Sequence, residues 1–315
     1  FVFNNSTHQI LAFGHEASEM IGRTPSDIFA FRPLQRGNIE NFDMTAELLR
    51  SAVAKVLKKK SMFSRPRAII SFPTPVNERD QLELIRILYD LGMRRTQIMD
   101  RAIAAALGAG IPLDSTGKLL VDISGGITDI TILTAQRNVF QENSNSLDRA
   151  VSGDSFTNAI IGEINGKYSF LIDERTAERL KIEIGNVLPI QNPPNLDVYG
   201  RNTITGLPKQ MQIKGSDIYS ALQIPLDLLC DFIQRALTKT SAEYSSDIYK
   251  NGFYLTGGGS MLGGLGHAIS ERLSVKTTIS NMPKYDVVLG IGYALENQSE
   301  TKQYLQYIRG GHISN

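Results

Sequence analysis

The sequence feature that most constrains the fold is a largely apolar run, KLLVDIS, at residues 118–124. Gly125 and Gly126 follow it, and a second apolar run, ITDITILTA, occupies residues 127–135. A strand that is apolar on both faces must be covered on both sides, as in sheets packed between helices. The two runs are therefore predicted to pair, across the glycines, as buried strands.

Amphipathic and apolar segments alternate along the whole sequence. Apolar residues recur at helical spacing in 43–58 and 77–92, and RAIISF at 67–72 is typical of a strand. Further helices are predicted at 15–21, 102–110, 154–165, 174–185, 216–239 and 286–297, and strands at 8–13, 96–99, 196–199, 209–213 and 252–256. This alternation predicts the α/β fold class, with helices covering the sheets.

The length and the charge balance exclude some classes of protein. A chain of 315 residues exceeds what one core usually holds, so we expect two domains, with a boundary near 134–145. The formal net charge of +1 argues against non-specific nucleic-acid binding. Cys230 is the only cysteine, which rules out an intrachain disulfide and favours a reducing compartment. No apolar run reaches the ~20 residues that a membrane helix needs.

The segment from Asp122 to Asp129 is the first candidate site. It places an acidic residue at a strand end, directly before a glycine turn. Because glycine has no Cβ, the amides of Gly125 and Gly126 can approach an anion closely. Asp122 can hold a Mg²⁺ ion through water. An ordinary glycine hairpin explains the same residues equally well.

Three further segments are candidate binding sites. Gly257, Gly258 and Gly259 follow an apolar strand and precede a helix, where backbone can approach a ligand; a flexible connection is the alternative. Glu178 and Lys181 are three residues apart and therefore share one helix face. They could hold an adenosine between them, or they could form an ordinary solvated ion pair. The segment 58–66 is typical of a loop that binds an anionic membrane surface, or of a helix C-terminus whose lysines complement the helix dipole. Its candidate residues are Lys58, Lys59, Lys60, Met62, Phe63 and Arg65.

In this order, these motifs resemble those of the superfamily of actin, heat-shock chaperones and sugar kinases. The resemblance to the MreB family of bacterial actins is close and covers nearly the whole chain. The segments that carry it are 15–39, 104–112, 122–129, 174–185, 199–209 and 255–262. It implies an actin-like ATPase fold with two ribonuclease-H-like lobes around a nucleotide cleft. The lobes would be 1–140, with a small insert at about 15–66, and 141–315, with an insert at about 167–240.

The resemblance also implies ligands and partners. ATP or ADP with Mg²⁺ would lie in the cleft, with Asp122, Gly125, Gly126 and Thr128 at the phosphates. Glu178, Lys181 and the glycines at 257–259 would contact the adenosine. The chain would polymerise head to tail into paired protofilaments. It would lie in the cytoplasm at the inner membrane face, bound through the 58–66 loop, and would serve cell shape or motility.

Two departures from the family pattern concern the phosphates. The family has a D-x-G-T phosphate loop ahead of the position of Phe1, and a chain without it is expected to bind nucleotide poorly. Arg101 stands where the family has a glutamate that orients the attacking water, and Ile127 stands where it has a threonine. Asp100 is a possible substitute for the glutamate, although strand residues alternate faces.

Losing a positioned polar group typically costs ~10²–10⁴-fold in rate, so we expect weak ATP hydrolysis. A conventional ATPase with fast turnover is the alternative, and Arg101 and Ile127 count against it. A scaffold that holds its nucleotide only as a structural element is a further alternative.

Overall fold

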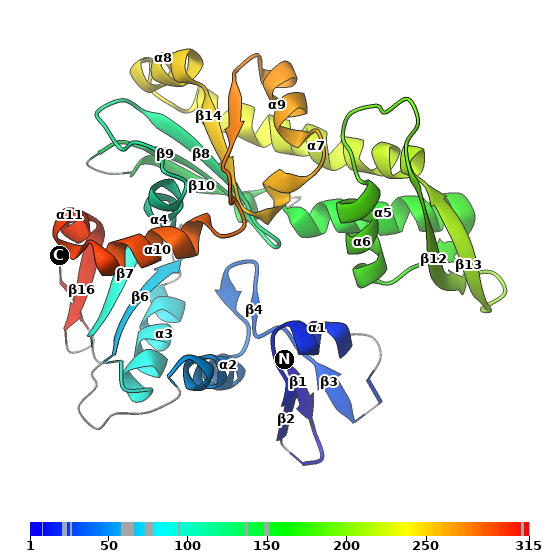
Figure 1. Cartoon of the computed structure of the whole chain (residues 1–315), viewed down its shortest axis with the longest axis horizontal. Coiled ribbons are helices and arrows are strands. Elements are labelled where there is room, and N and C mark those ends of the chain that lie inside the picture. The colour runs from blue at the N-terminus through cyan, green and yellow to red at the C-terminus, as the bar shows by residue number, and fades with distance from the viewer. Residues whose placement is uncertain are drawn as a thin grey trace. The chain divides into compact units, whose positions relative to one another are not determined.

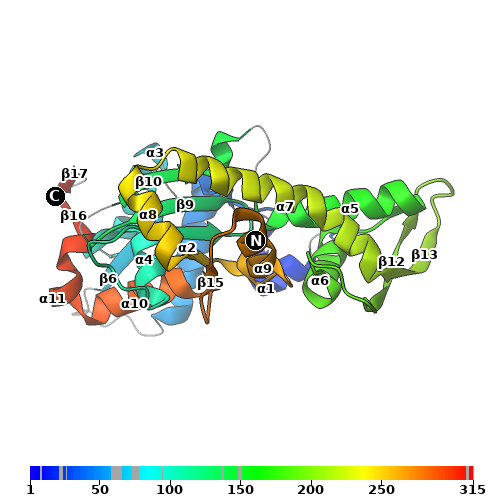
Figure 2. The ribbon, with the colours of Figure 1, turned by 90° about the horizontal axis from the view of Figure 1, so that it is seen from above.

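The computed structural model describes residues 1–7, 9–20, 24–25, 27–57, 66–72, 78–93, 95–135, 138–147, 151–309 and 312–314. They form two compact units, which Figures 1 and 2 show from two directions. The first unit contains the described residues of 1–72, 76–100 and 301–315, and the second those of 101–300. Within the described ranges, no helix combines the length and the apolar character needed to cross a membrane.

The larger sheet of the first unit has four strands in the order β17-β16-β7-β6. β6 and β7 are parallel, and β16 runs antiparallel to β7. Ile85 of helix α3 packs against Phe72 and Ile98 of the sheet, forming a small apolar core. The elements are β6 (Arg67–Phe72), α3 (Glu78–Asp90), β7 (Arg95–Asp100), β16 (Leu305–Arg309) and β17 (His312–Ser314).

Residues 1–56 add smaller elements to the first unit. A three-stranded sheet, β2-β1-β3, packs against helix α1 around Val2, Ala12 and Ala17. Helix α2 begins after Asn41, whose side chain accepts a hydrogen bond from the Met44 amide. The elements are β1 (Val2–Asn4), β2 (Gln9–Ala12), α1 (His15–Met20), β3 (Ile28–Ala30), β4 (Leu34–Gln35), β5 (Asn38–Ile39) and α2 (Phe42–Val56).

The second unit is built on a five-stranded sheet in the order β10-β9-β8-β14-β15. β8 and β14 are parallel, whereas β9 runs antiparallel to β8 and β10 antiparallel to β9. Every residue of β8 and β9 is buried, as their apolar sequences predict. The strands are β8 (Lys118–Ile123), β9 (Thr128–Leu133), β10 (Asn138–Asn143), β14 (Phe253–Thr256) and β15 (Thr277–Ile279).

Two helices pack closely together on one side of this sheet. In Figure 1, α4 (Arg101–Gly108) and α10 (Asp286–Glu296) lie side by side on the opposite side from α8 (Ala242–Asn251). A Cβ at Gly108 would overlap the Asp286 carbonyl, and one at Gly290 would overlap the Ala104 carbonyl. Glycine at both positions therefore allows the two backbones to touch.

A second sheet, in the order β11-β12-β13, belongs to the same unit and packs with three helices. The chain enters this part through a Ser152–Ser155 capping box, which starts α5. The elements are α5 (Gly153–Tyr168), β11 (Phe170–Leu171), α6 (Glu174–Ile184), β12 (Asn195–Asn202), β13 (Pro208–Lys214) and α7 (Gly215–Thr238). The rest of the unit consists of α9 (Leu265–Leu273), α11 (Gln298–Thr301) and single 3-10 turns.

The compact units divide the chain after Asp100, whereas the sequence suggested a division after residue 140. The reason is the pairing of β8 with β14, which joins 118–143 to 253–279 in one sheet. The residues expected to mark the boundary, 134–145, contain β10, which pairs with β9. The assignment of lobes and inserts stays a prediction.

Candidate functional site

The glycine hairpin between β8 and β9 brings two buried carboxylates together. Asp122 and Asp129 are partners in the strand register and are 3% and 4% exposed. The turn is closed by a hydrogen bond from the Ser124 amide to the Ile127 carbonyl, at 2.9 Å. Two carboxylates on adjacent strands need positive charge nearby if they are to stay ionised.

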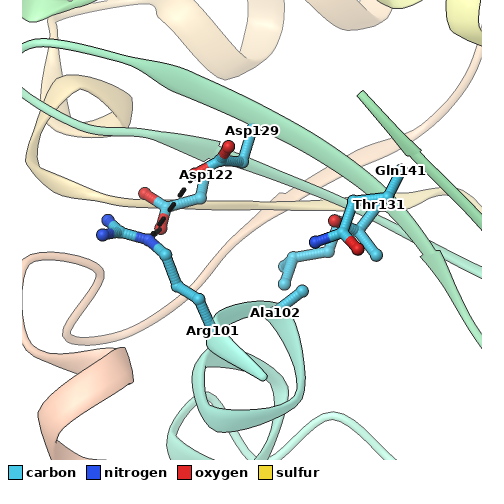
Figure 3. Close-up of a pocket in the computed structure, with 7 residues that line it drawn as sticks. Arg101, Ala102, Asp122, Asp129, Thr131 and Gln141 are labelled. Atoms are coloured by element: carbon cyan, nitrogen blue, oxygen red, sulfur yellow. Dashed lines mark hydrogen bonds and ion pairs between the residues drawn. The ribbon is translucent and has the colours of Figure 1, made fainter. Parts of the chain in front are cut away.

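Arg101 supplies that charge from the first residue of α4. Its Nε donates to Asp122 Oδ2 at 2.8 Å, and its Nη2 donates to Ser124 Oγ at 2.5 Å. Asp129 Oδ2 lies 3.6 Å from the same Nε. Burial lowers the pKa of the Arg101 guanidinium, but attraction and hydrogen bonding by Asp122, with attraction by Asp129, outweigh it and raise that pKa. Figure 3 shows the side chain reaching from α4 to the strand end.

The space beneath this ion pair is a small cavity. Figure 3 places Thr131 and Gln141 on one side of it, with Ala102 below them. Thr131 Oγ1 is buried and has no hydrogen-bond partner among the described residues. The cavity is too small to hold a nucleotide base.

The predicted Mg²⁺ site does not fit these residues well. Asp122 Oδ2 already bonds Arg101, and Asp122 Oδ1 accepts from Ser124 Oγ at 3.0 Å. A hydrated divalent ion at this carboxylate would have to displace those donors and would face the guanidinium charge. Among the described residues, no cluster of three or more His, Cys, Asp or Glu side chains is placed to hold a metal ion.

The second glycine loop lies against the same strand end. Thr256, the last residue of β14, pairs with Asp122, and Gly257 follows with φ of 79°. A Cβ at Gly257 would overlap Asp122 Oδ1 and the Ile123 carbonyl, so only glycine fits. Gly258 is exposed and Gly259 half-buried, which leaves this backbone open to a ligand beside the first turn.

Helix α5 begins directly at the first turn. The Gly153 amide donates to the Ser124 carbonyl at 2.9 Å, and the Asp154 amide donates to the Gly125 carbonyl at 2.7 Å. Gly125 itself is exposed and Gly126 is half-buried. The hairpin turn, with its accessible backbone, is thus held rigidly by a helix N-terminus.

Helix α6 places Glu178 and Lys181 beside the first turn of α5. Lys181 Nζ contacts Glu178 Oε2 at 2.6 Å and donates to the Gly153 carbonyl at 2.9 Å. Thr157 Oγ1 donates to Glu178 Oε2 at 2.6 Å. The lysine side chain is 10% exposed and the glutamate side chain 43% exposed. The pair is therefore more than a solvated surface contact, because it joins α6 to the first turn of α5.

The remaining predicted residues differ in their surroundings. Ile127 and Thr128 are buried, at 4% and 0% exposure, and the Thr128 amide donates to Ser144 Oγ. Asp100 ends β7 in the first unit, and its role as a substitute base stays a prediction. The proposed membrane residues, Lys58, Lys59, Lys60, Met62, Phe63 and Arg65, lie outside the described residues.

Sequence reasoning missed Ser124 and Asp129 as members of the cluster. A signal for Asp129 was available, because a hairpin centred on Gly125 and Gly126 places it opposite Asp122. The Ser124 contact depends on where α4 lies, which no local pattern specifies.

Comparison with known proteins identifies the family. The model of the MreB/Mbl protein family matches residues 1–303. The chain is 36% identical over 295 residues to the cell shape-determining protein Mbl of Bacillus cereus, covering 93% of this chain and 87% of that protein. The chain belongs to the MreB/Mbl family.

Two further comparisons agree with this membership. The cell shape-determining protein MreB of Escherichia coli is 33% identical over 292 residues, which are 92% of this chain and 83% of that protein. The crystal structure of MreB 5 of Spiroplasma citri bound to AMPPNP is 27% identical, with a TM-score of 0.89, covering 96% of this chain and 89% of that one. The fold of this MreB/Mbl chain is therefore the actin-like α/β fold that its sequence predicted.

Proposed function

We propose that this chain is a filament-forming cytoskeletal protein that binds ATP and ADP and hydrolyses ATP slowly. The observation that carries the proposal is the meeting of two glycine turns at the ends of β8 and β14. They join at Gly257, which packs on Asp122. Membership of the MreB/Mbl family supports self-assembly, and the AMPPNP complex of the Spiroplasma citri protein supports the nucleotide.

In the proposed complex, the phosphates lie at Gly125 and Gly126, next to the N-terminus of α5. Glycine has no Cβ, so the accessible backbone of Gly125 and Gly126 can approach an anion closely. The adenosine lies between the glycines at 257–259 and the Glu178–Lys181 pair. Lys181 is already tied to the Gly153 carbonyl, so it holds this side of the site in place.

Slow hydrolysis follows from the residues near the hairpin. Arg101 donates to Asp122 and Ser124, and a guanidinium cannot accept a proton from water. Ile127 is buried and has no hydroxyl to orient water. A fast, conventional ATPase would need another group in that role.

We also propose that the chain lies in the cytoplasm, at the inner face of the membrane. Its support is the sequence of the 58–66 loop, in which cations flank Met62 and Phe63. Polybasic contacts are worth ~1 kcal/mol per cation near an anionic surface. Pelleting with anionic liposomes should fall in the Met62→Ser/Phe63→Ser variant, and equal pelleting would show that this loop is not the anchor.

The experiment for nucleotide and assembly compares two glycine variants. Sedimentation and electron microscopy are run with ATP, with ADP and without nucleotide, alongside equilibrium nucleotide binding. We expect nucleotide-dependent filaments, lost with binding in Gly257→Ala because the added Cβ overlaps Asp122. Gly162→Ala on α5 is the matched control, since its Cβ meets nothing within 4 Å. Filaments and binding that are equal in both variants would contradict the site.

A further inference from the structure

The cluster of Arg101, Asp122, Asp129 and Ser124 carries an inference about the cation that accompanies the nucleotide. The three ionisable groups sum to one negative charge, because the arginine cancels one of the two buried carboxylates. Without the arginine the pair would carry two negative charges, the balance that a divalent cation satisfies. The arginine therefore removes the charge balance that would favour a divalent cation at this strand end.

The contacts of the guanidinium hold it firmly over the carboxylate. Nε is on Asp122, and Nη2 is on Ser124, whose hydroxyl in turn donates to the other Asp122 oxygen. On the far side of the carboxylate, Gly257 packs so tightly that a Cβ would overlap Oδ1. Both carboxylate oxygens thus have protein donors, and the approach on the Gly257 side is closed.

The outer edge of the guanidinium remains available to an anion. The Arg101 side chain is 22% exposed, and only Nε and one Nη2 hydrogen are used by the contacts above. Figure 3 shows its terminal nitrogens on the side away from Asp129. Guanidinium groups bind phosphate with two parallel hydrogen bonds, and they remain charged at any physiological pH.

We propose that Arg101 replaces the divalent cation in this chain, bridging Asp122 to the nucleotide phosphates, so that nucleotide binds without Mg²⁺. This inference rests on the proposed nucleotide site. A covalently attached cation then contacts the phosphates at the place where a metal ion would contact them. Chelating Mg²⁺ should therefore leave the affinity for nucleotide nearly unchanged.

The experiment measures equilibrium binding of ATP to the full chain in Mg²⁺ and in EDTA. For the unmodified chain we expect the Kd to differ by less than about threefold between the two conditions. Arg101→Glu adds a third carboxylate beside Asp122 and Asp129. In that variant Mg²⁺ should tighten binding by ~10-fold or more, a coupling of ordinary size.

Two controls separate charge at the site from charge in general. Arg235→Glu on α7 makes the same charge change at an exposed position and should bind like the unmodified chain in both conditions. Arg101→Gln removes the cation without adding a carboxylate, and its binding in EDTA should be lost even if Arg101→Glu fails to fold.

The outcomes distinguish this inference from the proposed function. Binding by the unmodified chain in Mg²⁺ but not in EDTA overturns the inference and leaves the nucleotide site standing. Binding in neither condition overturns the proposed function itself. Unchanged EDTA binding in Arg101→Gln shows that another group supplies the charge, which also overturns the inference.

Discussion

Asp122 and Asp286 are neighbouring buried carboxylates that the fold compensates in different ways. They are 3% and 0% exposed, and they are linked through Thr256, which pairs with Asp122 and donates to Asp286. Asp122 has a guanidinium as its partner. Asp286 has two hydroxyls, Thr256 Oγ1 at 2.5 Å and Ser280 Oγ at 2.7 Å, and the N-terminus of α10.

These partners determine which of the two carboxylates is accessible to a ligand. Asp286 is enclosed by neutral donors that also join β14 to α10, so its carboxylate serves the fold. Asp122 forms an ion pair with Arg101, whose side chain is partly exposed.

Removing the cation should be the most costly single change. Arg101→Met leaves Asp122 buried beside Asp129 with no opposite charge, and breaking such a pair costs about 3–5 kcal/mol. Chemical denaturation should show that loss. The double variant Arg101→Met/Asp122→Asn should recover much of it, and a double variant as unstable as the single one would contradict the charge argument.

Removing the carboxylate at the other position should cost less. Asp286→Ala removes the carboxylate that accepts from Thr256 and Ser280. Hydrogen bonds to a charged group contribute ~1.5–3 kcal/mol each, part of which water and the Pro283 carbonyl regain. We expect a loss of about 3 kcal/mol in the free energy of unfolding. Mg²⁺ and EDTA should make no difference to this variant's nucleotide binding relative to the parent.

A single hydroxyl on the Asp286 side should have a smaller effect. Thr256→Val keeps the shape of the side chain but removes one donor, for an expected loss of about 1–2 kcal/mol. The contribution should be non-additive with Asp286→Ala, because both changes remove the same hydrogen bond. Additive losses in the double variant would show that the hydroxyl acts through the Pro283 carbonyl instead.

A third buried carboxylate, Asp217, should make the stability of the fold depend on pH. Burial raises the pKa of Asp217, but hydrogen bonds from Lys167 and Tyr168 lower it by more, so that it lies below its ordinary value. A pKa that is lower in the folded state gives stability above about pH 4 that is lost as the pH falls further. Asp217→Asn should therefore cost ~1 kcal/mol at pH 7 and less at pH 3.

The matched control for that titration is Asp231→Asn, at an exposed position on the same helix. Its thermal unfolding should follow the parent at both pH values. A loss that is equal at pH 7 and pH 3 in Asp217→Asn would assign the effect to packing rather than to charge.

Much of the fold followed from local patterns in the sequence. The apolar runs predicted β8 and β9, and helical spacing predicted α2, α3, α6 and α7. β10 was missed because NVFQEN is polar and does not alternate, so only its pairing with β9 makes it a strand. The return of 305–309 to β7 was missed because long-range pairing leaves no local signature.

The sequence predicted the two glycine turns and the Glu178–Lys181 pair, but not the electrostatics around Asp122. The glycine turns and the Glu178–Lys181 pair could be recognised from spacing alone. Arg101 was recognised only as a departure from a family pattern. Its bond to Asp122 joins residues 21 positions apart through the packing of α4 on the sheet, which sequence reasoning did not supply.

The most direct test of the account is phosphate release from ATP by assembled filaments. The unmodified chain should release phosphate slowly, because Arg101 serves as the counter-ion of Asp122 and Ile127 has no hydroxyl to orient water. Arg101→Glu/Ile127→Thr with Mg²⁺ should release phosphate faster. Turnover of the unmodified chain at ~1 s⁻¹ or above, as in ordinary enzymes, would contradict the assignment of Arg101.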